Sequence, residues 1–349
     1  MTSPPNPLVG ILADDLTSAA DGAGPFVRKG LQATVSRQHL PQSRETDVIA
    51  VDIATRSMSE HDAAARVKEI TQELEGAQIV YKTVDSTLRG HVFAEVEAVI
   101  AGSQRKRLVF APAFPDAGRI TRDGFQFVDG VPVSESRYGS DPVHPARTSR
   151  LSDLVPSSVR DALLINAETQ DELNAKIAVI PDPEDVVWIG SPGLAIALSQ
   201  LVTSKSAQPS MPKVRSDILV VVGSTNAISS DQVGMVEEIV NVTVLRAPAE
   251  RADPGETLAA LTARAVSAIE TGRYGAVIAT GGDTMEAILN AIGVRSFDLT
   301  GEFEPGFPVG LADYKGEPLV LGLKAGGFGS PDSLRRAVDH LTGSKEYAL

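Results

Sequence analysis

Charged and hydroxyl side chains gather where two predicted strands end. Asp14 and Asp15 directly follow the apolar run 8–13, and the segment KTVDSTLRG, residues 82–90, overlaps the end of the run 79–84. Two adjacent carboxylates repel each other unless a cation, a hydrogen-bonding ligand or a helix N-terminus relieves the repulsion. This pair could therefore bind a metal ion or act as a base for a hydroxyl group. It could also cap the next helix, through Thr17 or Ser18, in a solvated turn.

The second segment combines two cations, one carboxylate and two hydroxyls before a helix expected near residue 92; they belong to Lys82, Asp85, Ser86, Thr87 and Arg89. A helix cap formed by Ser86 or Thr87 is the simpler interpretation. Arginine, however, is unfavourable in the first turn of a helix because its charge opposes the helix dipole. Its planar guanidinium suits a carboxylate or a phosphate group. The segment therefore indicates a pocket for a small anionic substrate.

Two more arginines follow other predicted strands in the same half of the chain. Arg56 comes after the run 48–53, and Arg119 lies in a proline-stiffened loop after the run 107–113. Each could form only a surface salt bridge. If the strands are neighbours in one parallel sheet, however, these strand ends converge at its carboxyl edge, where ligands of α/β proteins bind.

In the second half of the chain, the predicted strands end in glycine-rich turns. These are GSTN at residues 223–226, TGGDT at 280–284 and KAGGFG at 324–329. Glycine lets backbone N–H groups approach phosphate oxygens, and a helix N-terminus favours negative charge. Such turns also occur without a ligand, but three of them favour a phosphate-binding edge. The predicted contacts are Ser224, Gly281, Gly282, Asp283, Thr284, Lys324, Gly326 and Gly327.

The bulk composition excludes several classes of function. With 32 basic and 45 acidic side chains among 349 residues, the formal net charge is −13, which argues against nucleic-acid or anionic-membrane partners. The absence of cysteine excludes disulfides, zinc–thiolate sites and thiol catalysis. The P-loop and the dinucleotide fingerprint are missing, and the histidines have no metal-ligand spacing. Without a long apolar run or a signal-peptide pattern, a cytoplasmic protein is expected.

Short runs of Val, Ile and Leu alternate with helical patterns along the chain, on both sides of the segment TSKSAQPSMPKVRSD at residues 203–217. Such runs, bounded by turn signals, are typical of parallel strands buried on both faces. The predicted fold is therefore α/β with two domains, each a mainly parallel sheet flanked by helices, and a cleft between them. The predicted boundaries are residues 1–204, a linker at 205–217, and residues 218–349. The segment FQFVDGVPV, residues 125–133, also predicts a β-hairpin that turns at Asp129 and Gly130.

Seven segments resemble the four-carbon acid sugar kinase family, in the same order and over nearly the whole chain: ADDLTSAAD, KTVDSTLRGH, APAFPDAGR, VDGVPVSES, GSTNAISSDQ, TGGDTMEAI and LKAGGFGSPD. The resemblance implies that ATP phosphorylates the 4-hydroxyl of threonate, erythronate or 3-oxo-tetronate. It implies an N-terminal sugar-acid domain and a C-terminal nucleotide domain. It places Asp14, Asp15, Lys82, Asp85, Ser86 and Arg89 around the sugar acid, and Ser224, Gly281 through Thr284, and Gly326 at the nucleotide. The chain departs from the family pattern at Ser18, His91 and Ala325.

For such a reaction we expect Mg²⁺ to bridge the ATP phosphates, and Arg89 and Lys82 to pair with the substrate carboxylate or the transferred phosphoryl group. One of Asp14, Asp15 and Asp85 would accept the hydroxyl proton. Asp15 is favoured because a carboxylate at a strand end is held rigidly. Arg56, Ser86 and Arg119 complete the predicted substrate site.

Two other classes of function are alternatives to a kinase. A sugar-acid dehydrogenase or isomerase would need a nicotinamide fingerprint, which the chain lacks. A non-catalytic sugar-acid-binding protein would share the arginine-lined pocket but would not need three glycine-rich turns. The sequence fixes neither the stereochemistry of the acid nor the oligomeric state, and it leaves a homo-oligomer open.

Overall fold

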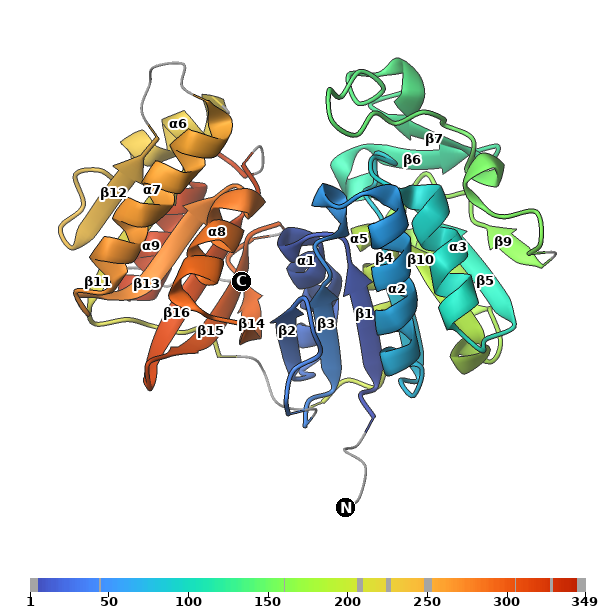
Figure 1. Cartoon of the computed structure of the whole chain (residues 1–349), viewed down its shortest axis with the longest axis horizontal. Coiled ribbons are helices and arrows are strands. Elements are labelled where there is room, and N and C mark those ends of the chain that lie inside the picture. The colour runs from blue at the N-terminus through green and yellow to red at the C-terminus, as the bar shows by residue number, and fades with distance from the viewer. Residues whose placement is uncertain are drawn as a thin grey trace. The chain divides into compact units, whose positions relative to one another are not determined.

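Runs of apolar residues form the central strands of an α/β protein, which confirms the predicted fold class. The structure is a computed structural model that describes residues 6–43, 45–159, 161–205, 210–223, 227–247, 253–304, 306–326 and 329–343. The chain divides into two units, unit 1 (Met1–Gln208) and unit 2 (Pro209–Leu349) (Figure 1). The sequence placed the linker at residues 205–217, and the structure divides the chain within that range.

Unit 1 is built on a parallel sheet whose strands follow the order β2-β3-β1-β4-β10-β5-β9. The strands are β1 (Val9–Ala13), β2 (Ala33–Arg37), β3 (Val48–Asp52), β4 (Ile79–Thr83), β5 (Arg107–Ala111), β9 (Ala162–Leu164) and β10 (Val186–Gly190). Every residue of β1, β3 and β4 is buried, as strands covered on both faces require. The strand β2 was not predicted from the sequence.

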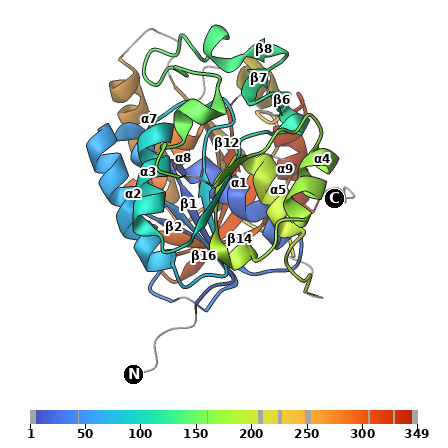
Figure 2. The ribbon, with the colours of Figure 1, turned by 90° about the vertical axis from the view of Figure 1, so that its right-hand side faces the viewer.

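Helices cover both faces of this sheet (Figure 2). The helices α2 (Glu60–Leu74) and α3 (Val92–Gly102) pack together on one face. On the other face, α1 (Leu16–Val27) and α4 (Gln170–Ala178) both contact α5 (Pro192–Ser199). The helix α2 shows why such helices pack on a sheet. Its buried residues Ala63, Val67, Ile70 and Leu74 recur at the helical spacing and therefore form one apolar face.

A small antiparallel sheet follows β5 in the chain. It consists of β6 (Arg119–Arg122), β7 (Phe125–Val128) and β8 (Val131–Pro132). Asp129 and Gly130 form the predicted turn between β7 and β8, with φ angles of 50° and 81°. Two consecutive positive φ angles define the tight hairpin turn that Asp-Gly favours, so the predicted hairpin is confirmed.

Unit 2 contains a mixed sheet in the order β12-β11-β13-β16-β15-β14. Four strands are parallel: β11 (Asp217–Val222), β12 (Val242–Arg246), β13 (Tyr274–Thr280) and β16 (Glu317–Lys324). The strands β14 (Ser296–Glu302) and β15 (Pro308–Tyr314) add two antiparallel pairings that the sequence analysis missed. These strands differ from the parallel ones in that buried and more exposed positions alternate. In β14 the buried positions are Phe297, Leu299 and Gly301.

Helices accompany the second sheet as well. The helices α7 (Pro254–Ile269) and α8 (Gly282–Ile292) pack against each other, and α6 (Ala227–Gly234) packs against α9 (Ser333–Thr342). The helix α6 ends at Gly234, a residue that destabilises a helix interior. In the part of the chain that the structure describes, every helix is too short or too polar to cross a membrane.

Candidate functional site

The topology of unit 1 brings three of the predicted strand ends together. The strand β1 pairs with β3 on one side and with β4 on the other, so Ala13 lies beside Asp52 and Leu12 lies beside Lys82. The carboxylates of Asp14 and Asp15 and the segment that follows β4 therefore share one edge of the sheet. The strand β5 is farther away, because β10 lies between it and β4.

Arg56 binds both members of the carboxylate pair. A short 3₁₀ turn, Thr55–Ser57, directs the side chain of Arg56 back to β1. Its Nε and Nη2 donate to Asp14 Oδ2 at 3.0 and 2.6 Å, and its Nη1 forms an ion pair with Asp15 Oδ2. The side chain of Asp14 is only 6% exposed, whereas that of Asp15 is 26% exposed. Asp15 is thus the carboxylate that a ligand can reach.

The two carboxylates differ in pKa. Burial raises the pKa of Asp14, but the charges of Arg56 and Lys82 together lower it more, and the net shift is downward. Burial also raises the pKa of Asp15, and there the negative charge of Asp14 adds to the effect; the net shift is upward despite Arg56. Two adjacent acids with opposite pKa shifts are typical of acid–base sites.

Asp15 also begins the helix α1. Its Oδ1 accepts a hydrogen bond of 2.6 Å from the backbone N–H of Ser18. The predicted cap at Thr17 or Ser18 is therefore wrong, because Asp15 precedes them and its carboxylate already accepts from a free N–H. This bond fixes the orientation of the Asp15 carboxylate.

Lys82 lies beneath this edge, completely buried. Its Nζ is 2.8 Å from Glu95 Oε2 and donates to the carbonyl of Thr83 at 2.6 Å. Glu95, which the sequence analysis missed, could have been found, because it lies on the buried face of α3 with Val92 and Val96. Glu95 is the ion-pair partner of Lys82, and the positive charge of Lys82 also lowers the pKa of Asp14.

Arg89 is held in place by the segment that precedes α3. Its Nε donates to Asp85 Oδ2 at 2.5 Å and to Thr87 Oγ1 at 3.1 Å. The backbone N–H of Thr87 donates to the other oxygen of Asp85. The simpler interpretation, in which Ser86 or Thr87 caps the helix, is wrong because His91 occupies the N-cap position of α3.

A tyrosine absent from the sequence-based prediction, Tyr138, connects several arginines. Arg89 lies over its ring at 5.2 Å and Arg137 at 4.9 Å, measured to the ring centroid. The hydroxyl of Tyr138 accepts from Arg137 Nη2 at 2.9 Å and from Arg119 Nη2 at 3.4 Å. The carboxylate of Asp141 is 3.4 Å from Arg89 Nη1. The structure thus joins Arg119 to the Arg89 segment, although its strand β6 belongs to the small sheet.

The glycine-rich turns of unit 2 also meet at one edge. The strands β11, β13 and β16 are neighbours, and the N–H of Gly281 donates to the carbonyl of Lys324 at 2.8 Å. Gly281 has a φ of 98°, and a Cβ on Gly223 would lie 2.0 Å from Thr284 Oγ1. Both positions therefore require glycine. The predicted contacts Ser224 and Gly327 lie outside the described residues.

Lys324 is 2% exposed at the end of β16. Its Nζ donates to the carbonyl of Ala325 at 3.1 Å, and it forms no ion pair with the residues that the structure describes. Burial lowers its pKa to about 8, although Glu304 acts in the opposite direction. A buried amine at a glycine-rich edge is suited to an anionic ligand, because the anion would supply the missing counter-charge.

Two buried side chains of α6 support the loop that follows Lys324. Ser229 Oγ donates to the carbonyl of Gly326 at 2.7 Å, and Gln232 Nε2 donates to the carbonyl of Ser330 at 2.8 Å. Both residues are fully buried. These two residues were not predicted from the sequence, although their spacing of three puts both on one helix face.

Comparisons with known proteins agree with this division of the chain. Residues 9–180 match the sugar-binding N-terminal domain family, and residues 241–334 match the nucleotide-binding C-terminal domain family. A D-threonate kinase from Cupriavidus necator is 31% identical, and the alignment covers 96% of this chain and 98% of the relative. The chain belongs to the four-carbon acid sugar kinase family.

A second relative and a solved structure are similar over the same extent. A 3-oxo-tetronate kinase from Methylobacterium radiotolerans is 24% identical over 95% of this chain and 98% of the relative. A solved structure from Salmonella typhimurium LT2 has a TM-score of 0.80 at 20% identity and covers 95% of this chain and 99% of its own, which supports the fold. As a member of this family, the protein is a phosphotransferase.

The buried ion pair under the site yields a stability prediction. Glu95→Gln leaves the ammonium of Lys82 buried without a counter-charge, which we expect to lower the free energy of unfolding by about 3–5 kcal/mol. Glu97→Gln, on the exposed side of the same helix, is the matched control and should change it by less than about 0.5 kcal/mol. Urea unfolding of both variants tests this, and equal midpoints would show that the pair has no structural role.

Proposed function

We propose that this protein is an ATP-dependent kinase that phosphorylates the terminal 4-hydroxyl of a four-carbon sugar acid such as threonate, erythronate or 3-oxo-tetronate. The observation that carries the proposal is the pair Asp14 and Asp15 under Arg56, with opposite pKa shifts, beside the Arg89 segment. The names of the relatives support the substrate class. We assign the sugar acid to unit 1 and the nucleotide to unit 2.

Asp15 is the proposed base. It accepts the proton of the substrate hydroxyl while the hydroxyl oxygen forms a bond to the γ-phosphorus of ATP. The bond from that phosphorus to the bridging oxygen breaks, and ADP leaves. A carboxylate with a raised pKa accepts and holds a proton more readily than an ordinary aspartate. Asp14 remains ionised and keeps Arg56 in position.

The arginines on the Tyr138 side are suited to the carboxylate of the sugar acid. Arg89 and Arg119 supply planar donors, and the Tyr138 ring limits their movement. Ser86 lies partly buried next to Asp85 and would bond a substrate hydroxyl. Lys82, paired with Glu95, contributes its charge rather than a direct contact.

The edge of unit 2 is suited to the phosphates of ATP. The N-terminus of α8 presents the backbone N–H groups of Gly282 and Asp283, and Lys324 provides a buried cation. Mg²⁺, when bound, would neutralise phosphate charge. It needs only one or two protein carboxylates, and the exposed Asp283 in the first turn of α8 fits that requirement.

The direct test of this function is ATP consumption with Mg²⁺ against a panel of acids. The panel contains D- and L-threonate, D- and L-erythronate, their 3-oxo forms, and glycerate as a three-carbon control. We expect turnover with at least one four-carbon acid, and a phosphorus–proton NMR correlation to the C4 protons of the product. Absence of turnover with every acid, together with absence of ATP binding, would contradict the proposal.

Replacing the proposed base separates chemistry from nucleotide binding. Asp15→Asn should lower turnover about 10²–10⁴-fold, because it removes the proton acceptor. The dissociation constant of ATP should stay within about twofold, since the phosphates are assigned to unit 2. Asp171→Asn, an exposed aspartate at the start of α4, is the control. Steady-state kinetics and calorimetry measure the two effects, and near-normal turnover of Asp15→Asn would rule out this base.

The lowered pKa of Lys324 predicts how nucleotide affinity depends on pH. The amine attracts phosphate only when protonated, and its pKa is about 8. Affinity for ATP should therefore fall as the pH rises through this value, by about tenfold for each further pH unit. Arginine remains charged in this range, so Lys324→Arg should bind ATP with little pH dependence. Calorimetric titrations between neutral and alkaline pH would refute the assignment if both proteins showed the same profile.

A further inference from the structure

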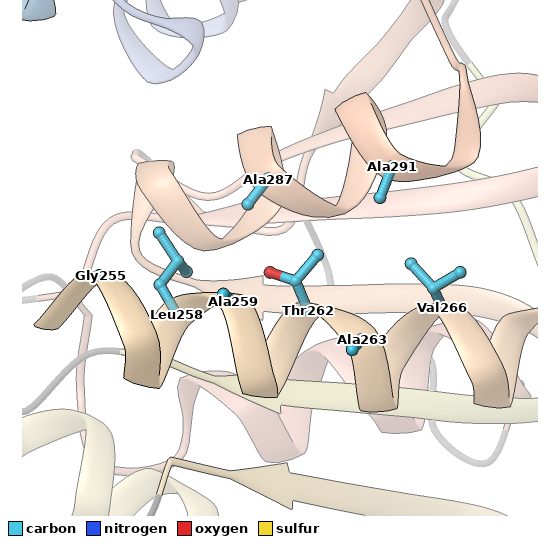
Figure 3. A pocket seen from close by; sticks show the side chains of 8 residues that line it. All are labelled: Gly255, Leu258, Ala259, Thr262, Ala263, Val266, Ala287 and Ala291. Atoms are coloured by element: carbon cyan, nitrogen blue, oxygen red, sulfur yellow. The ribbon is translucent and has the colours of Figure 1, made fainter. Parts of the chain in front are cut away.

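An open groove of about 590 Å³ runs between α7 and α8 in unit 2. Figure 3 shows side chains of both helices facing this space. The walls are almost entirely apolar, and most of the side chains are small. They include Leu258, Thr262, Ala263 and Val266 of α7 and Ala287 and Ala291 of α8. The groove is separate from the site residues discussed above.

Thr262 is the polar group of this groove. It is only 9% exposed, and its side chain points from α7 toward α8 (Figure 3). Its Oγ1 is buried without a hydrogen-bond partner among the residues that the structure describes. A buried hydroxyl without a partner costs free energy. A ligand in the groove would remove that cost by bonding to it.

The groove extends away from the glycine-rich edge. Both helices begin at the carboxyl edge of the sheet, α7 after β12 and α8 after β13. Gly255 lines the groove in the first turn of α7, and Ala287 lies five residues after Gly282, the first residue of α8. At 1.5 Å per residue, Ala287 is about 7.5 Å along α8 from its N-terminus. A group joined to the phosphates by a ribose would reach this point.

We propose that the groove between α7 and α8 binds the base of the nucleotide, an inference that rests on the proposed kinase function. Small side chains let a flat aromatic ring lie against both helices, and the apolar walls supply the contact that a base needs. The Thr262 hydroxyl can donate and accept one hydrogen bond each, which matches the neighbouring amino group and ring nitrogen of adenine.

The first test compares ATP with inorganic triphosphate, which has phosphates but no base. Thr262→Val keeps the shape of the side chain and removes the hydroxyl. It should weaken ATP binding about 3- to 10-fold and leave triphosphate binding unchanged. Because the hydroxyl has no protein partner, the unfolding midpoint without ligand should not fall. A purely structural residue would show the opposite: a lower midpoint and equal losses for both ligands.

A second variant narrows the groove with a matched control. Ala263→Leu places a larger side chain in the groove, whereas Ala260→Leu places it on the exposed surface of the same helix, outside the groove. Only Ala263→Leu should weaken ATP binding, by about tenfold or more, again with triphosphate unchanged. Sedimentation of both variants reports whether the groove instead holds a second copy of the chain.

The outcomes separate this inference from the proposed function. If the wild-type protein binds ATP and triphosphate but Thr262→Val and Ala263→Leu bind ATP normally, the groove does not hold the base and the kinase proposal stands. If Ala263→Leu changes the oligomeric state and leaves ATP affinity unchanged, the occupant is a second copy and the inference is overturned. If the wild-type protein binds neither ligand, both proposals fail.

Discussion

The guanidinium of Arg56 is the interaction on which the site of unit 1 depends. It contacts two carboxylates that would otherwise repel each other at the end of β1, and its charge lowers the pKa of both. Asp14 is buried deeply and stays ionised, whereas Asp15 is more exposed and has the higher pKa. The same negative charges keep the Arg56 guanidinium protonated. Burial lowers the pKa of Arg56, but Asp14, Asp15 and Asp85 raise it more. Removing the arginine would therefore disturb the ionisation of the whole edge.

Both units place chemical groups at the carboxyl edge of their parallel strands, but the two edges carry different kinds of group. Parallel strands end at one edge of a sheet, and the loops that follow them can hold chemical groups without disturbing the core. In unit 1 that edge carries compensated charge, with Lys82 neutralised by Glu95 beneath it. In unit 2 the edge carries glycine and one buried cation without an ion pair to the described residues, Lys324. A sugar acid needs exact placement of hydroxyls and a base, whereas phosphates need backbone N–H groups and positive charge.

The sequence predicted the features that local patterns determine. Continuous apolar runs revealed the buried strands, and Asp129 with Gly130 revealed a turn, because positive φ angles limit the residues allowed there. The sequence could not show that Tyr138 contacts three arginines or that Glu95 forms an ion pair with Lys82. These contacts depend on how distant segments pack. The sequence also assigned a helix cap to the residues after Asp15, because spacing alone cannot tell which of several polar side chains reaches the free N–H.

The separation of the two aspartate pKa values is the central claim, and carbon-13 NMR of selectively labelled aspartate carboxyls tests it most directly. Asp14→Asn and Asp15→Asn would assign the two signals. The account predicts that the Asp15 signal titrates above the ordinary aspartate pKa of 3.8 and the Asp14 signal below it. Exchange of Arg56 for glutamine should raise the pKa of Asp14. Titration of both carboxyls together at the ordinary value, or the reverse order, would contradict the account.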